Sequence, residues 1–72
     1  MTELRFDTKT GFGTTTVGKI EYIIMKTADG YSFGYKDYSD WLLMQGWIVE
    51  NKKRMSTIKK YAQQYSINVV DE

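Results

Sequence analysis

The sequence contains no cysteine, no histidine and no proline. Without cysteine it can form no disulfide and no thiol redox centre. Without histidine it lacks the general base of Ser-His-Asp and Cys-His catalysis and the commonest zinc ligand. These absences exclude most of the chemistry that side chains perform without a cofactor, so we expect that the chain is not an enzyme.

Other absences narrow the class of protein further. The acidic residues are scattered, and none follows the alternating pattern with a glycine and a distal glutamate that a calcium loop needs. The sequence has no apolar run long enough to span a membrane and no signal peptide at its polar N-terminus. We therefore expect no metal, no cofactor and no membrane partner. The lack of cysteine is typical of a cytoplasmic protein.

What is present is typical of a small globular domain. The chain has 72 residues, of which 42% are hydrophobic and 26% charged, with a net charge of +1. We expect one α+β domain over 1–72, with 1–36 mainly β, 37–66 mainly helical and 67–72 a tail or short strand. A domain of this size has a stability of only about 3–5 kcal/mol unless a ligand or an oligomer adds to it.

Strand signals dominate the first half. Leu4 and Phe6 alternate with polar residues and predict a short first strand. Residues 7–18 are rich in glycine and threonine, and this composition indicates a mobile loop or a loosely paired hairpin. Residues 19–27 are the strongest strand signal, with apolar side chains on both alternating faces. Such a strand is usually central or covered by helices.

The dipeptide Asp29-Gly30 predicts a hairpin, but not its register. A two-residue turn would put Tyr22 and Ile24 on the same face as the aromatic residues of the return strand. A three-residue loop would put Ile23 and Met25 there instead. In both registers three aromatic residues of the return strand share one face: Tyr31, Phe33 and Tyr35.

The second half has helical spacing. Asp37 or Ser39 could cap a helix that ends at Gly46, and a second helix is expected over 51–65. The apolar stripe of this second helix consists of Met55, Ile58, Ala62 and Tyr65, with Tyr61 beside it. A single helix with a heptad seam over 41–65 is the alternative, and Gly46 weakens it. We expect a small antiparallel sheet of about three strands packed against one or two C-terminal helices.

One motif suggests a nucleotide site. Residues 13–19 match the phosphate-binding pattern G-x-x-x-x-G-K. That pattern needs a serine or threonine next, followed by a helix whose N-terminus faces the phosphates. Here Ile20 follows and begins a predicted strand. The match is therefore interpreted as a coincidence of a Gly/Thr-rich segment.

Two groups of residues are candidates for binding a partner. The first is a basic group on the predicted second helix, suited to phosphates or an acidic protein surface: Lys52, Lys53, Arg54, Lys59 and Lys60. The second is a group of large aromatic residues of the types enriched at binding hot spots: Tyr31, Tyr35, Tyr38, Trp41 and Trp47. We expect at least one large aromatic side chain to be partly exposed, because two tryptophans do not fit easily into so small a core.

The hypothesis that fits these features best is non-catalytic binding. We expect a small protein that docks on a larger protein or assembly as an inhibitor or adaptor, as many small proteins of phages and mobile elements do. The first alternative is a nucleic-acid-binding module that uses the basic helix over 51–65 and the sheet aromatics. The second alternative is a homo-oligomeric structural subunit, such as a homodimer.

Overall fold

The computed structural model describes residues 1–39 and 46–72, which form strands and one helix. The elements are β1 (Thr2–Phe6), β2 (Phe12–Val17), β3 (Ile20–Lys26), β4 (Tyr31–Asp37), β5 (Ile48–Lys52), α1 (Met55–Gln63) and β6 (Ile67–Asp71). The expected α+β class is confirmed.

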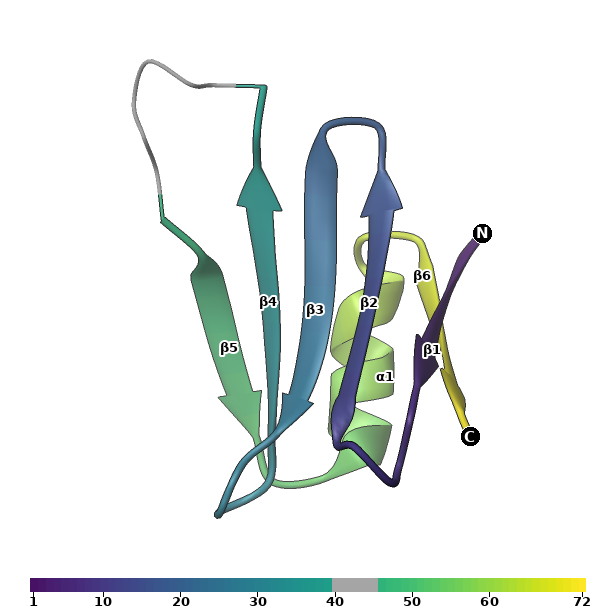
Figure 1. Cartoon of the computed structure of the whole chain (residues 1–72), viewed down its shortest axis with the longest axis vertical. Helices are drawn as coiled ribbons and strands as arrows, with labels where there is room; N and C mark the ends of the chain where they lie inside the picture. Colours follow the sequence, from purple (N-terminus) through teal and green to yellow (C-terminus); the bar gives the residue numbers. More distant parts are fainter. Residues whose placement is uncertain (40–45) are drawn as a thin grey trace.

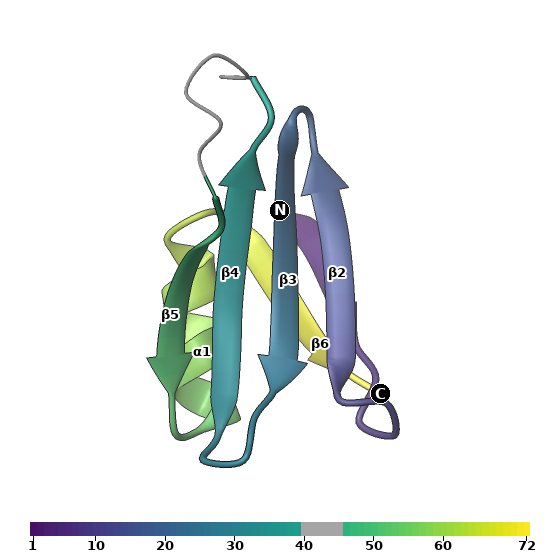
Figure 2. The same ribbon diagram turned by 60° about the vertical axis from the view of Figure 1, so that its left-hand side comes forward.

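The described strands form two sheets. Strands β2, β3, β4 and β5 make a four-stranded antiparallel sheet in chain order, one strand more than the expected three or so (Figure 1). Strands β1 and β6 make a separate parallel pair. Figure 2 shows α1 behind β4 and β5, and the β1–β6 pair behind β3 and β2. These elements cover one face of the sheet, and no other described element covers the opposite face.

The core lies between the four-stranded sheet and this second layer. Its buried hydrophobic residues are Leu4, Phe6, Tyr22, Ile24, Phe33, Ile58, Ala62, Ile67 and Val69. The stripe predicted for the second helix is confirmed: Ile58 and Ala62 are buried, and Met55, Tyr61 and Tyr65 pack against the core. The helix itself is shorter than the predicted 51–65, because the chain is still extended up to Lys52.

The hairpin between β3 and β4 has a register that neither prediction gave. Ile24 lies opposite Phe33, and Tyr22 lies opposite Tyr35, with residues 27–30 in the loop. Both predicted loops were therefore too short. A two-residue turn at Asp29-Gly30 would pair Ile24 with Tyr35, so the observed register differs from that one by two positions. Since strand side chains alternate with a period of two, that shift keeps Tyr22 and Ile24 on the face of Phe33 and Tyr35.

Part of the Gly/Thr-rich segment over 7–18 is a strand. The prediction of a mobile loop is wrong, and the alternative of a hairpin describes the chain better. Thr14 lies opposite Ile23, and Thr16 lies opposite Glu21, in a continuous antiparallel ladder with β3. Threonine is β-branched and fits a pleated strand, so a run of three threonines favours this conformation once β3 is present as a neighbour.

The prediction that residues 37–66 are mainly helical is wrong. Strand β4 continues to Asp37, and residues 48–52 form β5, an edge strand paired with β4. A single helix over 41–65 is excluded for the same reason. The predicted helix that ends at Gly46 falls mostly on residues 40–45, which lie outside the described residues.

The last expected strand is confirmed as β6. It runs parallel to β1, with Leu4 opposite Val69 and Thr2 opposite Ile67. The first and last strands of the chain are therefore neighbours, and both supply buried side chains to the core.

A cluster of tyrosines makes the fold sensitive to high pH. Tyr22 and Tyr35 have ring centroids 6.1 Å apart, and those of Tyr35 and Tyr65 are 5.1 Å apart. Burial raises the pKa of Tyr22, a hydrogen bond with Tyr65 raises the pKa of Tyr35, and a hydrogen bond with Tyr61 raises the pKa of Tyr65. The folded state therefore holds these protons more tightly than the unfolded chain, whose phenols titrate near pH 10.

This stabilisation of the folded state is fully present at a pH below the pKa of the phenols in the unfolded chain. It is lost as the pH rises through the raised pKa values of the folded state. We expect the melting temperature to fall steeply above about pH 10, when it is measured by circular dichroism alongside phenolate absorbance. Lysines also titrate in this range, so Tyr22→Phe serves as the control and should show a shallower fall. Equal slopes for the two proteins would contradict this prediction.

Candidate functional site

The uncovered face of the four-stranded sheet carries an apolar groove. Side chains alternate between the two faces of a strand, so every second residue of each strand points to this face. Met25 of β3 is 45% exposed, Val49 of β5 is 52% exposed, and Trp47 just before β5 is 41% exposed. They border a hollow of about 340 Å³, which we call the open-face groove. Its lining residues are Ile23, Met25, Ser32, Gly34, Trp47 and Val49.

The groove exists because position 34 has no side chain. Gly34 is buried in the middle of β4, between Ile23 of β3 and Val49 of β5. A Cβ atom at this position would lie 3.2 Å from Cγ2 of Ile23 and 3.5 Å from Cγ2 of Val49. Glycine inside a strand costs about 0.5–1 kcal/mol relative to alanine. It often marks a place where a ligand or another chain approaches closely.

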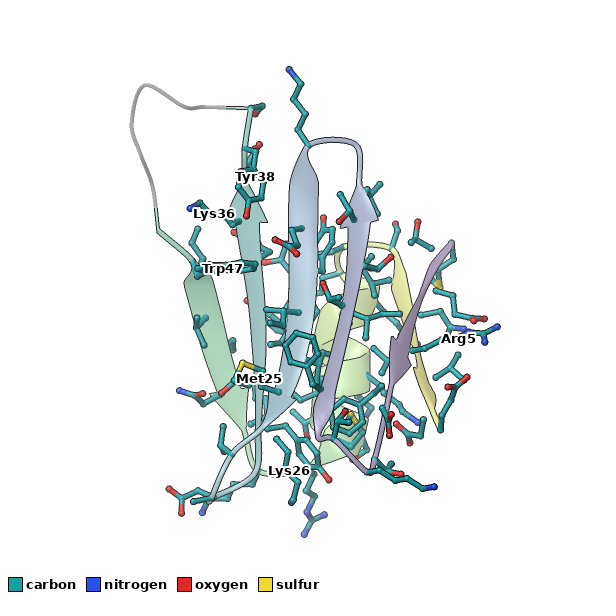
Figure 3. The ribbon with its side chains drawn as sticks, viewed as in Figure 1. Arg5, Met25, Lys26, Lys36, Tyr38 and Trp47 are labelled. Carbon is teal, nitrogen blue, oxygen red and sulfur yellow. The ribbon has the colours of Figure 1, made fainter. Side chains whose placement is uncertain are left out.

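Polar and aromatic side chains lie at one end of the groove. The hydroxyl of Tyr38 donates to Oε1 of Glu21 over 3.0 Å, and this hydrogen bond raises the pKa of the Tyr38 phenol. The Nζ of Lys36 lies 5.2 Å from the centroid of the Tyr38 ring. No carboxylate of the described residues is within ion-pair distance of this ammonium group. Figure 3 shows Lys36, Tyr38, Trp47 and Met25 along this side of the molecule.

The predicted aromatic candidates are divided between the two faces. Trp47 and Tyr38 lie at the open face, 41% and 51% exposed, in agreement with the expectation of a partly exposed large aromatic. Tyr31 and Tyr35 point to the covered face, where they are half-buried and pack against the core. Trp41 lies outside the described residues. The structure therefore brings two of the five candidates to one surface.

The predicted basic residues do not form one helix face. Because α1 begins at Met55, three of them precede the helix. The Nζ of Lys52 is 3.2 Å from a carboxylate oxygen of Glu50, and the Nζ of Lys59 is 2.9 Å from one of Asp71. These two ion pairs neutralise part of the expected positive surface. Within the described chain, three of the basic candidates have no ion pair: Lys53, Arg54 and Lys60.

A second hollow lies between the β3–β4 turn and the end of β5. It measures about 400 Å³, and its lining residues are Thr27, Asp29, Tyr31, Asn51, Lys52 and Lys53. The Nζ of Lys26, at this lower end of the molecule in Figure 3, lies 5.0 Å from the ring centroid of Tyr31. Asp29 places a negative charge beside the lysines, so this hollow is less suited to a phosphate than a purely cationic site.

Sequence reasoning missed most of the groove. Ile23, Met25, Gly34 and Val49 were not among the candidates, although residues 19–27 carried a usable signal. That segment has apolar side chains on both faces, and we interpreted this as a strand that is central or covered by helices. Strand β3 is indeed central, between β2 and β4. In the described structure only the face of Tyr22 and Ile24 is covered, so Ile23 and Met25 mark an exposed surface instead.

Comparisons of the chain with models of protein families, with curated proteins and with solved structures find no match. Across residues 1–39 and 46–72, no three acidic side chains gather as a metal ion would require. None of the helical structure described is long and apolar enough to cross a membrane.

Proposed function

We propose that this chain is a non-catalytic binding protein that docks on a larger protein through the open-face groove and acts as an inhibitor or adaptor. The observation that carries the proposal is the hollow over Gly34, bordered by the exposed side chains of Met25, Trp47 and Val49. Single exposed apolar residues are normal on protein surfaces. A contiguous apolar patch around a hollow is typical of interaction sites.

The groove favours a partner of definite chemistry. Its walls are mainly aliphatic and aromatic, so it suits an apolar side chain that protrudes from the partner. Lys36 lies at one end, opposite Glu21 of β3, and no carboxylate of the described residues is within ion-pair distance of its ammonium group. An acidic residue beside that apolar side chain would therefore complete the contact. Trp47 and Tyr38 are of the residue types that supply most binding energy at interfaces.

A matched pair of valines tests the proposal. Val49 lies in the groove and is 52% exposed, whereas Val17 lies at the far end of β2 and is 41% exposed. Val49→Glu puts a carboxylate into the groove, and Val17→Glu makes the same change elsewhere. Both variants should fold, since exposed substitutions usually change stability by about 0.5 kcal/mol or less. We expect Val49→Glu to weaken partner binding by about 100-fold and Val17→Glu to leave it unchanged.

The measurement begins with capture from the native host on immobilised wild-type and variant chains. A captured protein is then purified, and its affinity for all three chains is measured by calorimetry. The proposal is supported only if the purified protein binds wild type and Val17→Glu but not Val49→Glu. Equal binding to both variants would overturn it. Retention of nucleic acid that is released by moderate salt would also overturn it, in favour of phosphate contacts.

A further inference from the structure

Strand β5 leaves one side of the four-stranded sheet unpaired. Figure 1 shows β5 at the margin of the sheet, with β4 on its inner side and no described strand along its outer side. An unpaired edge offers a row of backbone donors and acceptors to another strand. Helix α1 contacts β4 and β5 and lies behind them in Figure 2, on the covered face, so it does not occupy the plane of the sheet beside β5.

The hydrogen-bond pattern of the sheet identifies the backbone groups that face outward. Thr27 and Gly30 exchange backbone hydrogen bonds at the β3–β4 turn, and the N–H of Tyr38 donates to the carbonyl of Lys19 at the other end. Antiparallel ladders alternate between bonded and non-bonded pairs. The residues of β4 that do not bond to β3 bond to β5 instead, so the same alternation continues in β5. It turns the N–H and C=O groups of Val49 and Asn51 away from β4.

The charges of β5 favour pairing of this strand with a second copy of itself. A two-fold antiparallel pair can be centred on Val49, Glu50 or Asn51. Centring on Glu50 places two carboxylates opposite each other, and centring on Val49 places Ile48 opposite Glu50 of the second copy. Centring on Asn51 places Glu50 of each copy opposite Lys52 of the other, next to the ion pair that the same two residues form within each chain. It does so in a non-bonded pair, where side chains are closest.

We propose that two copies of this chain associate by antiparallel pairing of their β5 strands about Asn51. This arrangement joins both four-stranded sheets into one continuous sheet and leaves the two open-face grooves on the same side. Asn51 supports it, because its Oδ1 accepts a hydrogen bond from the hydroxyl of Ser32, which leaves its amide N–H groups available at the edge. The proposal concerns the edge of the sheet and is independent of what fills the groove.

The association is expected to be weak. With the axis at Asn51, only Glu50, Asn51 and Lys52 of each β5 lie opposite one another, so the pair buries less surface than a standard interface of about 1,200–2,000 Å². We expect a reversible dimer whose fraction rises between about 10 μM and about 1 mM of chain. Sedimentation velocity over this range measures it. A chain that stays monomeric throughout would overturn the proposal.

Single cysteines test the register, because the natural sequence contains none. At the proposed axis the two Asn51 Cα atoms lie about 5.5 Å apart, within the range that a disulfide spans. Each Val49 lies opposite residue 53 of the other copy, which is four residues along the strand from the other Val49. The two Val49 Cα atoms are therefore more than about 13 Å apart. Under mild oxidation, we expect Asn51→Cys to form a disulfide dimer at least about tenfold faster than Val49→Cys. Equal rates, or a faster reaction of Val49→Cys, would overturn the register.

A charge exchange tests the side-chain pairing. Glu50→Lys and Lys52→Glu each place like charges opposite each other at the axis, and each should raise the dimer dissociation constant about fivefold or more. The double variant Glu50→Lys/Lys52→Glu restores opposite charges and should recover dimerisation to near the wild-type level. Each variant is first checked for folding by circular dichroism. If the double variant stays monomeric while folded, Glu50 and Lys52 do not set the register and the proposal fails.

Discussion

Phe33→Ala should leave most of the chain unfolded at room temperature. Phe33 is fully buried in the middle of β4, and its ring centroid lies 5.5 Å from that of Tyr61 and 5.7 Å from that of Tyr65. It thus connects the sheet to α1 and to the turn that follows the helix. Truncation of a buried phenylalanine to alanine costs about 3–5 kcal/mol. A domain of this size has a total stability of only about 3–5 kcal/mol.

The matched control is Phe12→Ala. Phe12 carries the same side chain at the start of β2, but it is 43% exposed. Its truncation should cost clearly less, about 1–2 kcal/mol, because nearly half of the surface of this residue stays in water in the folded chain. Urea denaturation followed by circular dichroism separates the two variants. If Phe33→Ala unfolds cooperatively with a midpoint close to that of Phe12→Ala, the core is not organised around Phe33.

The elements predicted correctly are those with a local periodic signal. The aromatic residues of the return strand and the three- and four-residue spacing from Met55 to Ala62 each reflect one buried face, and the β-branched residues of 19–27 indicate a strand. Burial of one face produces such a pattern wherever the element packs in the fold. The hairpin, the helix and the α+β class could therefore be predicted from the sequence.

Elements whose conformation depends on residues far away in the sequence were predicted wrongly. Ile48 and Asn51 of β5 also fit the helical heptad over 41–65, and these residues form a strand because they pair with β4. Strand β2 contains glycine and threonine without a clear apolar face, and it is held by β3 on one side and crossed by β1. The parallel pair of β1 and β6 joins the two ends of the chain, and no local pattern encodes such a contact.

The candidate site was only partly predictable for a related reason. Tyr38 and Trp47 were candidates because of their residue type, and they lie at the open face. The groove itself depends on the absence of a side chain at Gly34 between two neighbouring strands. A glycine in a strand is visible in the sequence, but its neighbours across the sheet follow from the register, which the sequence left open.

Gly13→Ala should destabilise the fold severely, although alanine usually suits a strand better than glycine does. Strand β1 crosses β2 at this position. A Cβ atom on Gly13 would overlap the carbonyl oxygen of Arg5 and lie 2.9 Å from Cα of Phe6 and 3.0 Å from Cδ2 of Leu4. Two of these atoms belong to the backbone, so no side-chain rotation relieves the overlap. The whole of β1 would have to move away from β2.

Such a movement would also disturb the buried side chains of Leu4 and Phe6 and the pairing of β1 with β6. Overpacking alone costs about 1–3 kcal/mol, and the loss of these contacts adds to it, so we expect most of the stability to disappear. Gly46→Ala is the control, because nothing lies within 4 Å of a Cβ atom there and its φ is not positive. That variant should match wild type within about 0.5 kcal/mol. If urea denaturation shows equal stability for the two variants, β1 does not cross β2 at Gly13.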